Sequence, residues 1–233
     1  MRALTAAVFD VRFQFRHGFY YAYLVVCILY ILIIRSLTGE AASIVATLLI
    51  FSDTSVLGFF FVGGVILLEK DQRTLETLFV SPLRIYEFII AKILSLAVLS
   101  VVMSLVIMVF SIGTSFKPVL FLAGVLLSSA FFTLLGITFS AYSRSINVYL
   151  FKSSFGIMLI FLPMLGYFKL FETPFFYLFP TKASLILIES AFKSFQPMEL
   201  VYAVACLLLW IAAIGIIAHN SFYKNIIMKI GES

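Results

Sequence analysis

The chain is short of charge, cysteine and histidine, and it lacks the motifs of common nucleotide-binding and hydrolytic proteins. Charged residues make up 12% of its 233 residues, with two cysteines and two histidines. Cys27, Cys206, His17 and His219 have no metal-ligand spacing, so we expect no metal site. No G-x-x-x-x-G-K-S/T, G-x-S-x-G or H-E-x-x-H motif occurs. The usual mode of ATP binding and the common hydrolase classes are therefore excluded.

Apolar residues dominate instead, at 63% of the chain, and they fall in long runs. A helix needs about 20 apolar residues to cross a bilayer. Continuous runs favour helices over a membrane β-barrel, whose strands would alternate apolar and polar residues. We therefore expect an all-α integral membrane protein with a single transmembrane domain over residues 1–233. Its six predicted transmembrane helices are residues 18–34, 41–68, 93–116, 118–143, 145–168 and 200–223.

The distribution of lysine and arginine predicts that both termini are cytoplasmic, because that orientation puts most basic residues on the inner side. The inner side then receives Arg2, Arg12, Arg16, Lys70, Arg73, Arg84, Lys92, Arg144, Lys224 and Lys229. The outer side receives Arg35, Lys117, Lys169, Lys182 and Lys193. We interpret the net charge of +5 as a consequence of this topology and expect a lipid bilayer, not nucleic acid, as partner.

Residues 1–19 have the pattern of an amphipathic helix that leads into the first span. Arg12 and Arg16 lie four residues apart on one face. Apolar residues recur at steps of three and four on another face, at Leu4, Val8, Val11, Phe15 and Phe19. We expect this helix to lie in the membrane interface. The alternative is a cytoplasmic extension of the first span.

Residues 69–87 concentrate charge between the second and third spans, with acidic residues nearly balancing basic ones. Topology alone would favour only positive charge there. Leu75, Leu78 and Phe79 form an apolar patch on a predicted short helix, and Ser81-Pro82 is typical of a new helix start that runs into the third span. A mixed-charge helix with exposed apolar residues indicates a docking surface for another protein. The alternative is a solvated loop whose charges pair with one another.

The same segment resembles the permease subunits of type-2 ABC exporters. The resemblance rests on Glu69, Thr74-Leu75-Glu76, Leu78, Ser81-Pro82-Leu83, Glu87 and Lys92, together with the six spans and the N-terminal helix. It implies that residues 69–87, called the coupling segment below, form a coupling helix that docks on a separate ABC ATPase subunit. The coupling residues would be Glu69, Arg73, Thr74, Glu76, Leu78, Phe79, Ser81 and Pro82.

The resemblance also implies the composition of the complex. Two permease chains, identical or homologous, would assemble with the ATPase subunits. ATP and Mg would bind to the ATPase, so this chain would carry no cofactor and would not itself be an enzyme.

Residues 169–199 form the longest predicted outer connection and are too apolar for a solvated loop. We expect two short re-entrant or interfacial helices, broken near Pro180 and buried against the bundle. The F-P-T-x-A-S-L pattern at residues 179–185 resembles bacterial drug-export permeases, including those described as fluoroquinolone exporters. That resemblance implies a drug-export permease in the bacterial cell membrane. The short predicted outer loops leave no room for a large extracellular domain, which favours a small hydrophobic substrate, drug-like or a lipid, over a bulky polymer.

Asp53 is the one acidic residue inside a predicted span. Ionisable residues within spans are costly and commonly functional. Asp53, with Ser52 and Thr54, is therefore a candidate for the translocation path, where it would meet a cationic group of the substrate. Alternatively, it lies near the outer end of the second span and contacts its neighbours or an outer basic residue. A different class of function, an ion-gradient-driven secondary transporter using Asp53, is the alternative to the exporter.

Overall fold

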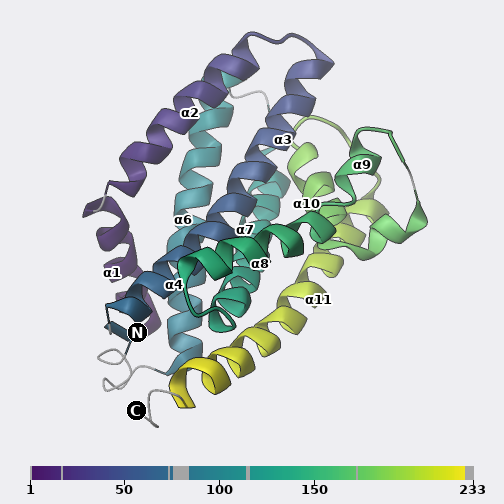
Figure 1. Ribbon diagram of the computed structural model, residues 1–233. Helices are drawn as coiled ribbons and strands as arrows, with labels where there is room; N and C mark the ends of the chain where they lie inside the picture. The colour runs from purple at the N-terminus through teal and green to yellow at the C-terminus, as the bar shows by residue number, and fades with distance from the viewer. Residues whose placement is uncertain are drawn as a thin grey trace.

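The computed structural model describes residues 2–16, 18–72, 74–75, 84–113, 116–171 and 173–228. Within these ranges every regular element is a helix, as the long apolar runs predicted. The helices form a bundle whose two termini lie at the same end (Figure 1). In chain order the elements are α1 Arg2–Arg16, α2 Phe19–Arg35, α3 Glu40–Val56, the π-helix η1 Leu57–Phe61, α4 Val62–Asp71, α6 Ile85–Ser111, α7 Pro118–Ala141, α8 Ile146–Ile160, α9 Met164–Tyr167, the 3-10 helix η2 Pro174–Leu178, α10 Pro180–Glu189, α11 Pro197–Phe222 and the π-helix η3 Tyr223–Ile227.

Four helical segments in the described part of the chain are long and apolar enough to cross a membrane. They are Glu40–Asp71 (α3, η1 and α4), α6, α7 and Pro197–Ile227 (α11 and η3). The pair α1 and α2 passes the same test jointly, although the two helices meet at 69°, and would make a fifth span. α8 is apolar but has 15 residues, fewer than the predicted fifth span, because Pro163 interrupts the run after its end.

The predicted N-terminal helix is present, but it ends at Arg16 and does not continue to Phe19. Gly18 separates α1 from α2 with a left-handed backbone, φ 79°. Glycine adopts this conformation without the steric penalty that a Cβ atom brings. The chain therefore turns sharply at Gly18, and Phe19 belongs to the next helix.

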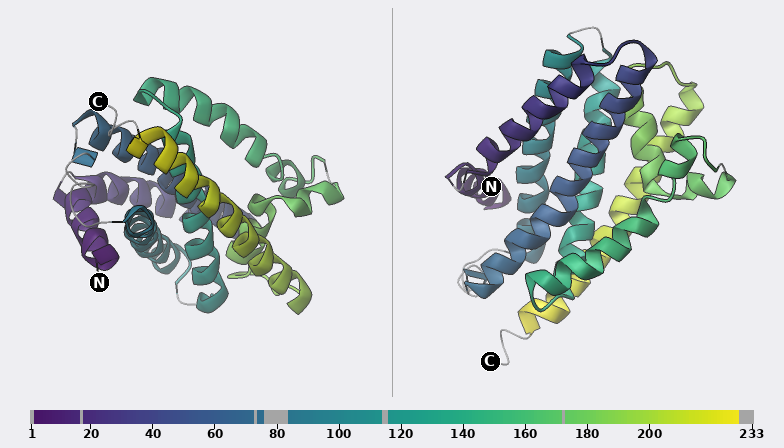
Figure 2. Two further views of the ribbon diagram at one scale, coloured as in Figure 1. Left: turned by 90° about the horizontal axis from the view of Figure 1, so that it is seen from below. Right: turned by 45° about the horizontal axis from the view of Figure 1, so that its top comes forward.

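α1 lies at the edge of the bundle and packs against α6 (Figure 2). The side chains that α1 buries are Ala7 and Gln14. Leu4, Val8 and Phe15, from its predicted apolar face, are each more than half exposed. The helix thus turns a small and polar side to the protein and its apolar side outward.

The π-helical turn η1 interrupts the long segment made by α3 and α4, and it is packed from two sides. A Cβ on Gly136 of α7 would lie 2.5 Å from the Phe59 carbonyl oxygen, so these backbones are in close contact. In a π-helical turn the backbone hydrogen bonds join residues i and i+5, so carbonyl groups lose their usual α-helical N–H partners. The Tyr149 hydroxyl of α8 donates a hydrogen bond to this Phe59 carbonyl, and Gly63 leaves room for the Tyr149 ring. α7 and α8 thereby fix the position of the turn.

α7 occupies the centre of the bundle and contacts α3, η1, α6, α10 and α11. Small residues at its contacts let neighbouring backbones approach, as is common between helices in membranes. A Cβ on Gly124 would lie 2.8 Å from Cβ of Leu187 on α10. On another side, the Ser100 hydroxyl of α6 donates to the Ser129 hydroxyl at 3.4 Å.

The predicted outer segment contains two short helices, η2 and α10, with the break at Pro180 as expected. α10 is largely buried between α3, α7 and α11. The Thr181 hydroxyl donates to the Ile160 carbonyl at 2.5 Å and fixes the start of α10 to the end of α8. After α10, Lys193 pairs with Glu40 at the start of α3, at 3.3 Å. The segment is therefore packed against the bundle, as its apolar composition predicted.

Candidate functional site

Lys92 lies about two turns inside the apolar helix α6, where its side chain is only 4% exposed. Its Nζ atom is 3.0 Å from Oδ1 of Asp10 on α1 and 2.5 Å from Oε1 of Glu69 on α4. We call these three residues the Lys92 ion cluster. It joins three helices at the end of the bundle that carries both termini.

The surroundings of the Lys92 ion cluster favour strong electrostatic interaction. Both carboxylate side chains are 15% exposed, and the Phe88 ring centroid is 5.1 Å from Lys92 Nζ. An unpaired ion in such an environment costs several kcal/mol, so Lys92 depends on its acidic partners. With all three groups ionised, the cluster has one more negative than positive charge. Oε2 of Glu69 has no hydrogen-bond partner among the described residues.

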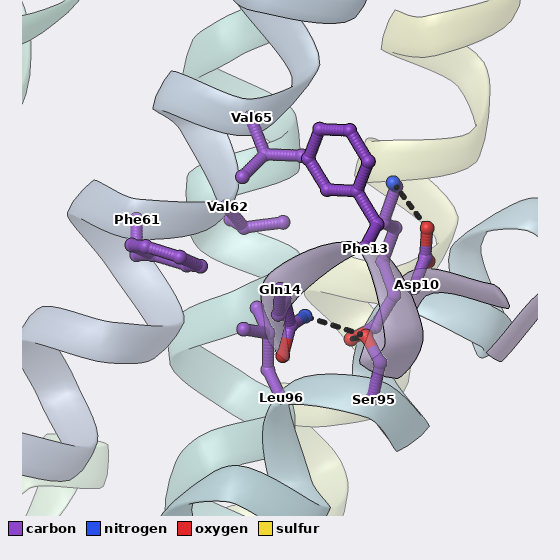
Figure 3. Close-up of a pocket in the computed structure, with 9 residues that line it drawn as sticks. Asp10, Phe13, Gln14, Phe61, Val62, Val65, Ser95 and Leu96 are labelled. Atoms are coloured by element: carbon purple, nitrogen blue, oxygen red, sulfur yellow. Dashed lines mark hydrogen bonds and ion pairs between the residues drawn. The ribbon is translucent and has the colours of Figure 1, made fainter. Parts of the chain in front are cut away.

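A second polar contact lies one turn further along α1 and α6. Nε2 of Gln14 donates to the Ser95 hydroxyl at 3.4 Å. Figure 3 shows Asp10, Gln14 and Ser95 around a small space that apolar side chains of η1 and α4 also line. Its volume of about 10 Å³ is close to the smallest that holds one water molecule. This small space is therefore part of the contact between α1, α4 and α6, and it cannot hold a drug-sized ligand.

The structure describes only part of the coupling segment. Arg73, Glu76, Leu78, Phe79, Ser81 and Pro82 lie outside the described residues. Glu69 is near the end of α4 within the Lys92 ion cluster, and Thr74 is exposed. Leu75 is 1% exposed and belongs to the main hydrophobic core. The prediction that Leu75 contributes to an exposed patch is wrong, because its side chain faces the bundle.

Helix α6, whose first residues belong to the coupling segment, also begins later than predicted. Arg84 is the N-cap of α6 and has an extended backbone, with φ −83° and ψ 152°. The Glu87 carboxylate accepts a hydrogen bond from the Arg84 backbone N–H at 2.8 Å. This carboxylate satisfies a donor that the helix leaves free at its start. A helix that begins at Ser81-Pro82 therefore does not continue into α6.

The sequence placed Lys92 among the inner loop charges, and it did not identify Asp10. Lys92 instead lies within a helix of membrane-spanning length, because α6 begins at Ile85. A lysine inside an apolar helix needs an acidic partner, so the position of Lys92 within an apolar run could have indicated a buried ion pair. Nothing in the sequence indicated that Asp10 and Glu69 would both supply it.

Asp53 lies near the middle of the segment Glu40–Asp71 and is 4% exposed. Its predicted alternative position, near the outer end of the span, is wrong. The polar residues beside it suggested a membrane surface, but such hydroxyls can bond to their own helix. Ser55, for example, donates to the Phe51 carbonyl at 2.7 Å. Of the other predicted path residues, Ser52 is half-buried and Thr54 is fully buried.

The Asp53 carboxyl faces α2. It is close enough to Tyr23, Cys27 and Tyr30 of α2 to interact with them electrostatically. Its Oδ2 atom has no hydrogen-bond partner, and no described basic side chain forms an ion pair with it. Cys27 also contacts Met103 of α6, with 3.5 Å between the sulfur atoms. The free oxygen can therefore accept a hydrogen bond from a donor that enters between α2 and α3.

Both cysteines are free thiols, Cys27 buried and Cys206 half-buried. Across the described ranges no group of three or more His, Cys, Asp or Glu side chains is arranged to hold a metal ion. The candidate functional groups of the described chain are therefore the Lys92 ion cluster and Asp53.

Comparison with known proteins covers nearly the whole chain. The model of the fluoroquinolones export permease protein family matches residues 1–230. Two proteins of Mycobacterium tuberculosis, from strains CDC 1551 / Oshkosh and ATCC 25618 / H37Rv, are both named fluoroquinolones export permease protein. Each is 24% identical to this chain over 233 residues, which is 99% of this chain and 98% of the relative. The predicted resemblance to exporter permeases is confirmed by these matches.

Proposed function

Since this chain belongs to the fluoroquinolones export permease family, we propose that it is the membrane-spanning subunit of an ATP-driven exporter for small hydrophobic, drug-like compounds. A separate ABC ATPase would bind ATP and Mg, and a second copy of this chain or a homologue would complete the pathway. The names of the two mycobacterial relatives support drug export.

The proposed topology has six spans in the cell membrane, with both termini in the cytoplasm. The spans would be α2, α3 with η1 and α4, α6, α7, α8 with α9, and α11. The outward apolar side of α1 supports an interfacial position for that helix. The packing of α10 between other helices supports a re-entrant position for the outer segment.

The position of the Lys92 ion cluster is the observation that carries the proposed coupling. Glu69 is the first residue of the coupling segment, and its ion pair with Lys92 ties the end of α4 to α6. Asp10 adds α1 to the same joint. A movement of the coupling segment driven by the ATPase would therefore reach three helices at once. The buried ion pairs suit this role because separating them is costly.

ATP hydrolysis by the cognate ATPase in lipid nanodiscs tests this proposal. The ATPase is measured alone, with the wild-type chain, and with Arg73→Glu or Glu76→Ala. We expect the chain to stimulate hydrolysis and to co-purify with the ATPase, and both substitutions to reduce these effects. Lys152→Ala, on the exposed surface of α8, is the control and should behave as wild type.

The opposite result would have a clear meaning. If no ATPase binds and the coupling substitutions change nothing, the exporter proposal is wrong. Ion-driven transport through Asp53 would then be measured by imposing an ion gradient on proteoliposomes without ATP.

Asp53 is the proposed contact for a cationic group of the substrate. Asp53→Asn keeps the shape of the side chain and removes its charge. Export of a cationic fluoroquinolone should fall by at least about 30-fold, since losing one partner of a buried charge contact costs about 2 kcal/mol or more. Export of a neutral compound should fall much less. Equal losses for the two compounds would contradict the contact and indicate a structural role for Asp53.

A further inference from the structure

A groove open to the outside of the bundle separates α6 from α11. Both helices pack on α7, and they contact each other through the Phe88 and Phe222 rings, whose centroids are 5.2 Å apart. The groove has a volume of about 570 Å³. Leu134 of α7 lines it together with isoleucines such as Ile90 of α6 and Ile216 of α11. It lies on two helices of membrane-spanning length, so lipid can reach it directly.

The groove is polar at one end only. Tyr86, His219 and Asn220 line the end where α6 begins and α11 finishes, which is the end of the bundle that carries both termini. The remaining lining side chains are apolar, and Gly215 contributes no side chain. An occupant that matches this pattern has a polar head and a long apolar body.

The polar end is also positively charged. Nη1 of Arg84 donates to the Tyr86 hydroxyl at 3.1 Å, and its guanidinium lies 5.9 Å from the Tyr86 ring centroid. The nearby Glu87 carboxylate accepts a hydrogen bond from the Arg84 backbone N–H at 2.8 Å and keeps its negative charge. Lys224 is exposed further along the same end of α11, in η3. Two basic residues and one acidic residue therefore lie at this end, with Arg84 bonded to the Tyr86 hydroxyl at the mouth of the groove.

We propose that the groove between α6 and α11 binds one anionic phospholipid. Its acyl chain would lie along Ile90, Leu134 and Gly215, and its phosphate would lie beside Arg84, His219 and Asn220. With the proposed topology this lipid belongs to the cytoplasmic leaflet, where anionic lipids are concentrated and a nearby basic residue strengthens their binding. The volume is within the range of about 300–1,000 Å³ of ligand pockets. The site is separate from Asp53 and from the predicted coupling residues, although Arg84 and Tyr86 belong to the last part of the coupling segment.

Gly215→Leu is the principal test, because Gly215 lines the groove and a leucine side chain at this position would occupy its volume. Among the described residues, a Cβ at Gly215 would have one neighbour within 4 Å, Cδ1 of Leu134 at 3.8 Å, so the substitution does not strain the helix contact. Gly64→Leu is the matched control, since it also adds a side chain to a helical glycine whose Cβ would have no neighbour within 4 Å in the described part of the chain. Arg84→Gln removes the charge at the polar end and leaves the groove open.

The measurement is native mass spectrometry of the purified full chain titrated with phosphatidylglycerol or phosphatidylcholine. The wild type should bind one phosphatidylglycerol about fivefold more tightly than phosphatidylcholine, the effect of one basic residue beside an anionic head group. Gly215→Leu should lose this lipid, whereas Gly64→Leu should keep it. Arg84→Gln should remove the preference and still bind phosphatidylcholine.

Three results would overturn the proposal. The first is equal binding of both lipids by the wild type, and the second is wild-type binding by Gly215→Leu. The third is a dimer that Gly215→Leu converts to monomer with lipid binding unchanged, which would make the groove a subunit interface. None of these readouts uses ATP hydrolysis, so this inference and the exporter proposal fail independently.

Discussion

Lys92→Met would remove the cation of the Lys92 ion cluster and keep a side chain of similar length. Asp10 and Glu69, each 15% exposed, would then face each other without a counter-ion. At an effective dielectric constant of about 20, the Coulomb energy is about 5.5 kcal/mol for the pair with Asp10 at 3.0 Å and about 6.6 kcal/mol for the pair with Glu69 at 2.5 Å. Desolvation offsets part of this, and loss of one partner from a buried pair costs about 3–5 kcal/mol. The corresponding decrease in Tm is roughly 6–20 °C for a chain of this size.

The assay is thermal unfolding of the purified chain in detergent, with Lys152→Met as the control. Lys152 is exposed and donates one long hydrogen bond, to the Tyr142 carbonyl at 3.4 Å, so its replacement should change Tm little. Combining Lys92→Met with Asp10→Asn and Glu69→Gln should restore most of the lost stability, because no buried charge is left unpaired. The reasoning is refuted if both lysine variants unfold at the same temperature, or if the triple variant is no more stable than Lys92→Met.

Two further predictions use the same unfolding assay. Gly136→Ala should destabilise the chain by about 1–3 kcal/mol, because the new Cβ would lie 2.5 Å from the Phe59 carbonyl oxygen. The control Gly64→Ala, whose Cβ would meet no described atom within 4 Å, should be neutral or slightly stabilising. Lys193→Ala should cost less than about 1 kcal/mol, since its ion pairs are partly exposed. The hydrogen bond to Glu189 raises the pKa of Lys193 above 10.5, so the difference from wild type should stay constant from pH 7 to 9 and disappear only above about pH 10.5. A difference that shrinks between pH 7 and 9 would contradict this.

The fold was largely predictable because the apolar runs are long and helix formation inside a membrane is nearly obligatory. The errors occur where a single residue decides a boundary. Gly18 ends the first helix early, and Pro163 shortens the predicted fifth span. The start of α6 is fixed by the hydrogen bond from the Arg84 backbone N–H to the Glu87 carboxylate. The Ser-Pro pattern three residues before Arg84 led to a prediction of an earlier start.

The candidate site was only partly predictable. Asp53 was identifiable because an acid within an apolar run is rare, but its neighbours on α2 depend on helix packing that a single sequence does not contain. The same limit applies to Asp10, which is 82 residues away from Lys92 in the chain. Periodicity indicates which residues share a helix face, and it gives no information on which faces meet.

The π-helical turn η1 sets the rotational phase between the two halves of the segment Glu40–Asp71. Successive residues of an α-helix are rotated by about 100°, and a π-helical turn holds about one residue more than an α-helical turn. If η1 were ordinary α-helix, α4 would be rotated by about 100° relative to α3. Asp53 could then face α2 only if Glu69 turned away from Lys92. The alignment of the buried Asp53 with Glu69 of the Lys92 ion cluster therefore depends on one turn of five residues, which the Tyr149 hydroxyl holds through its hydrogen bond to the Phe59 carbonyl.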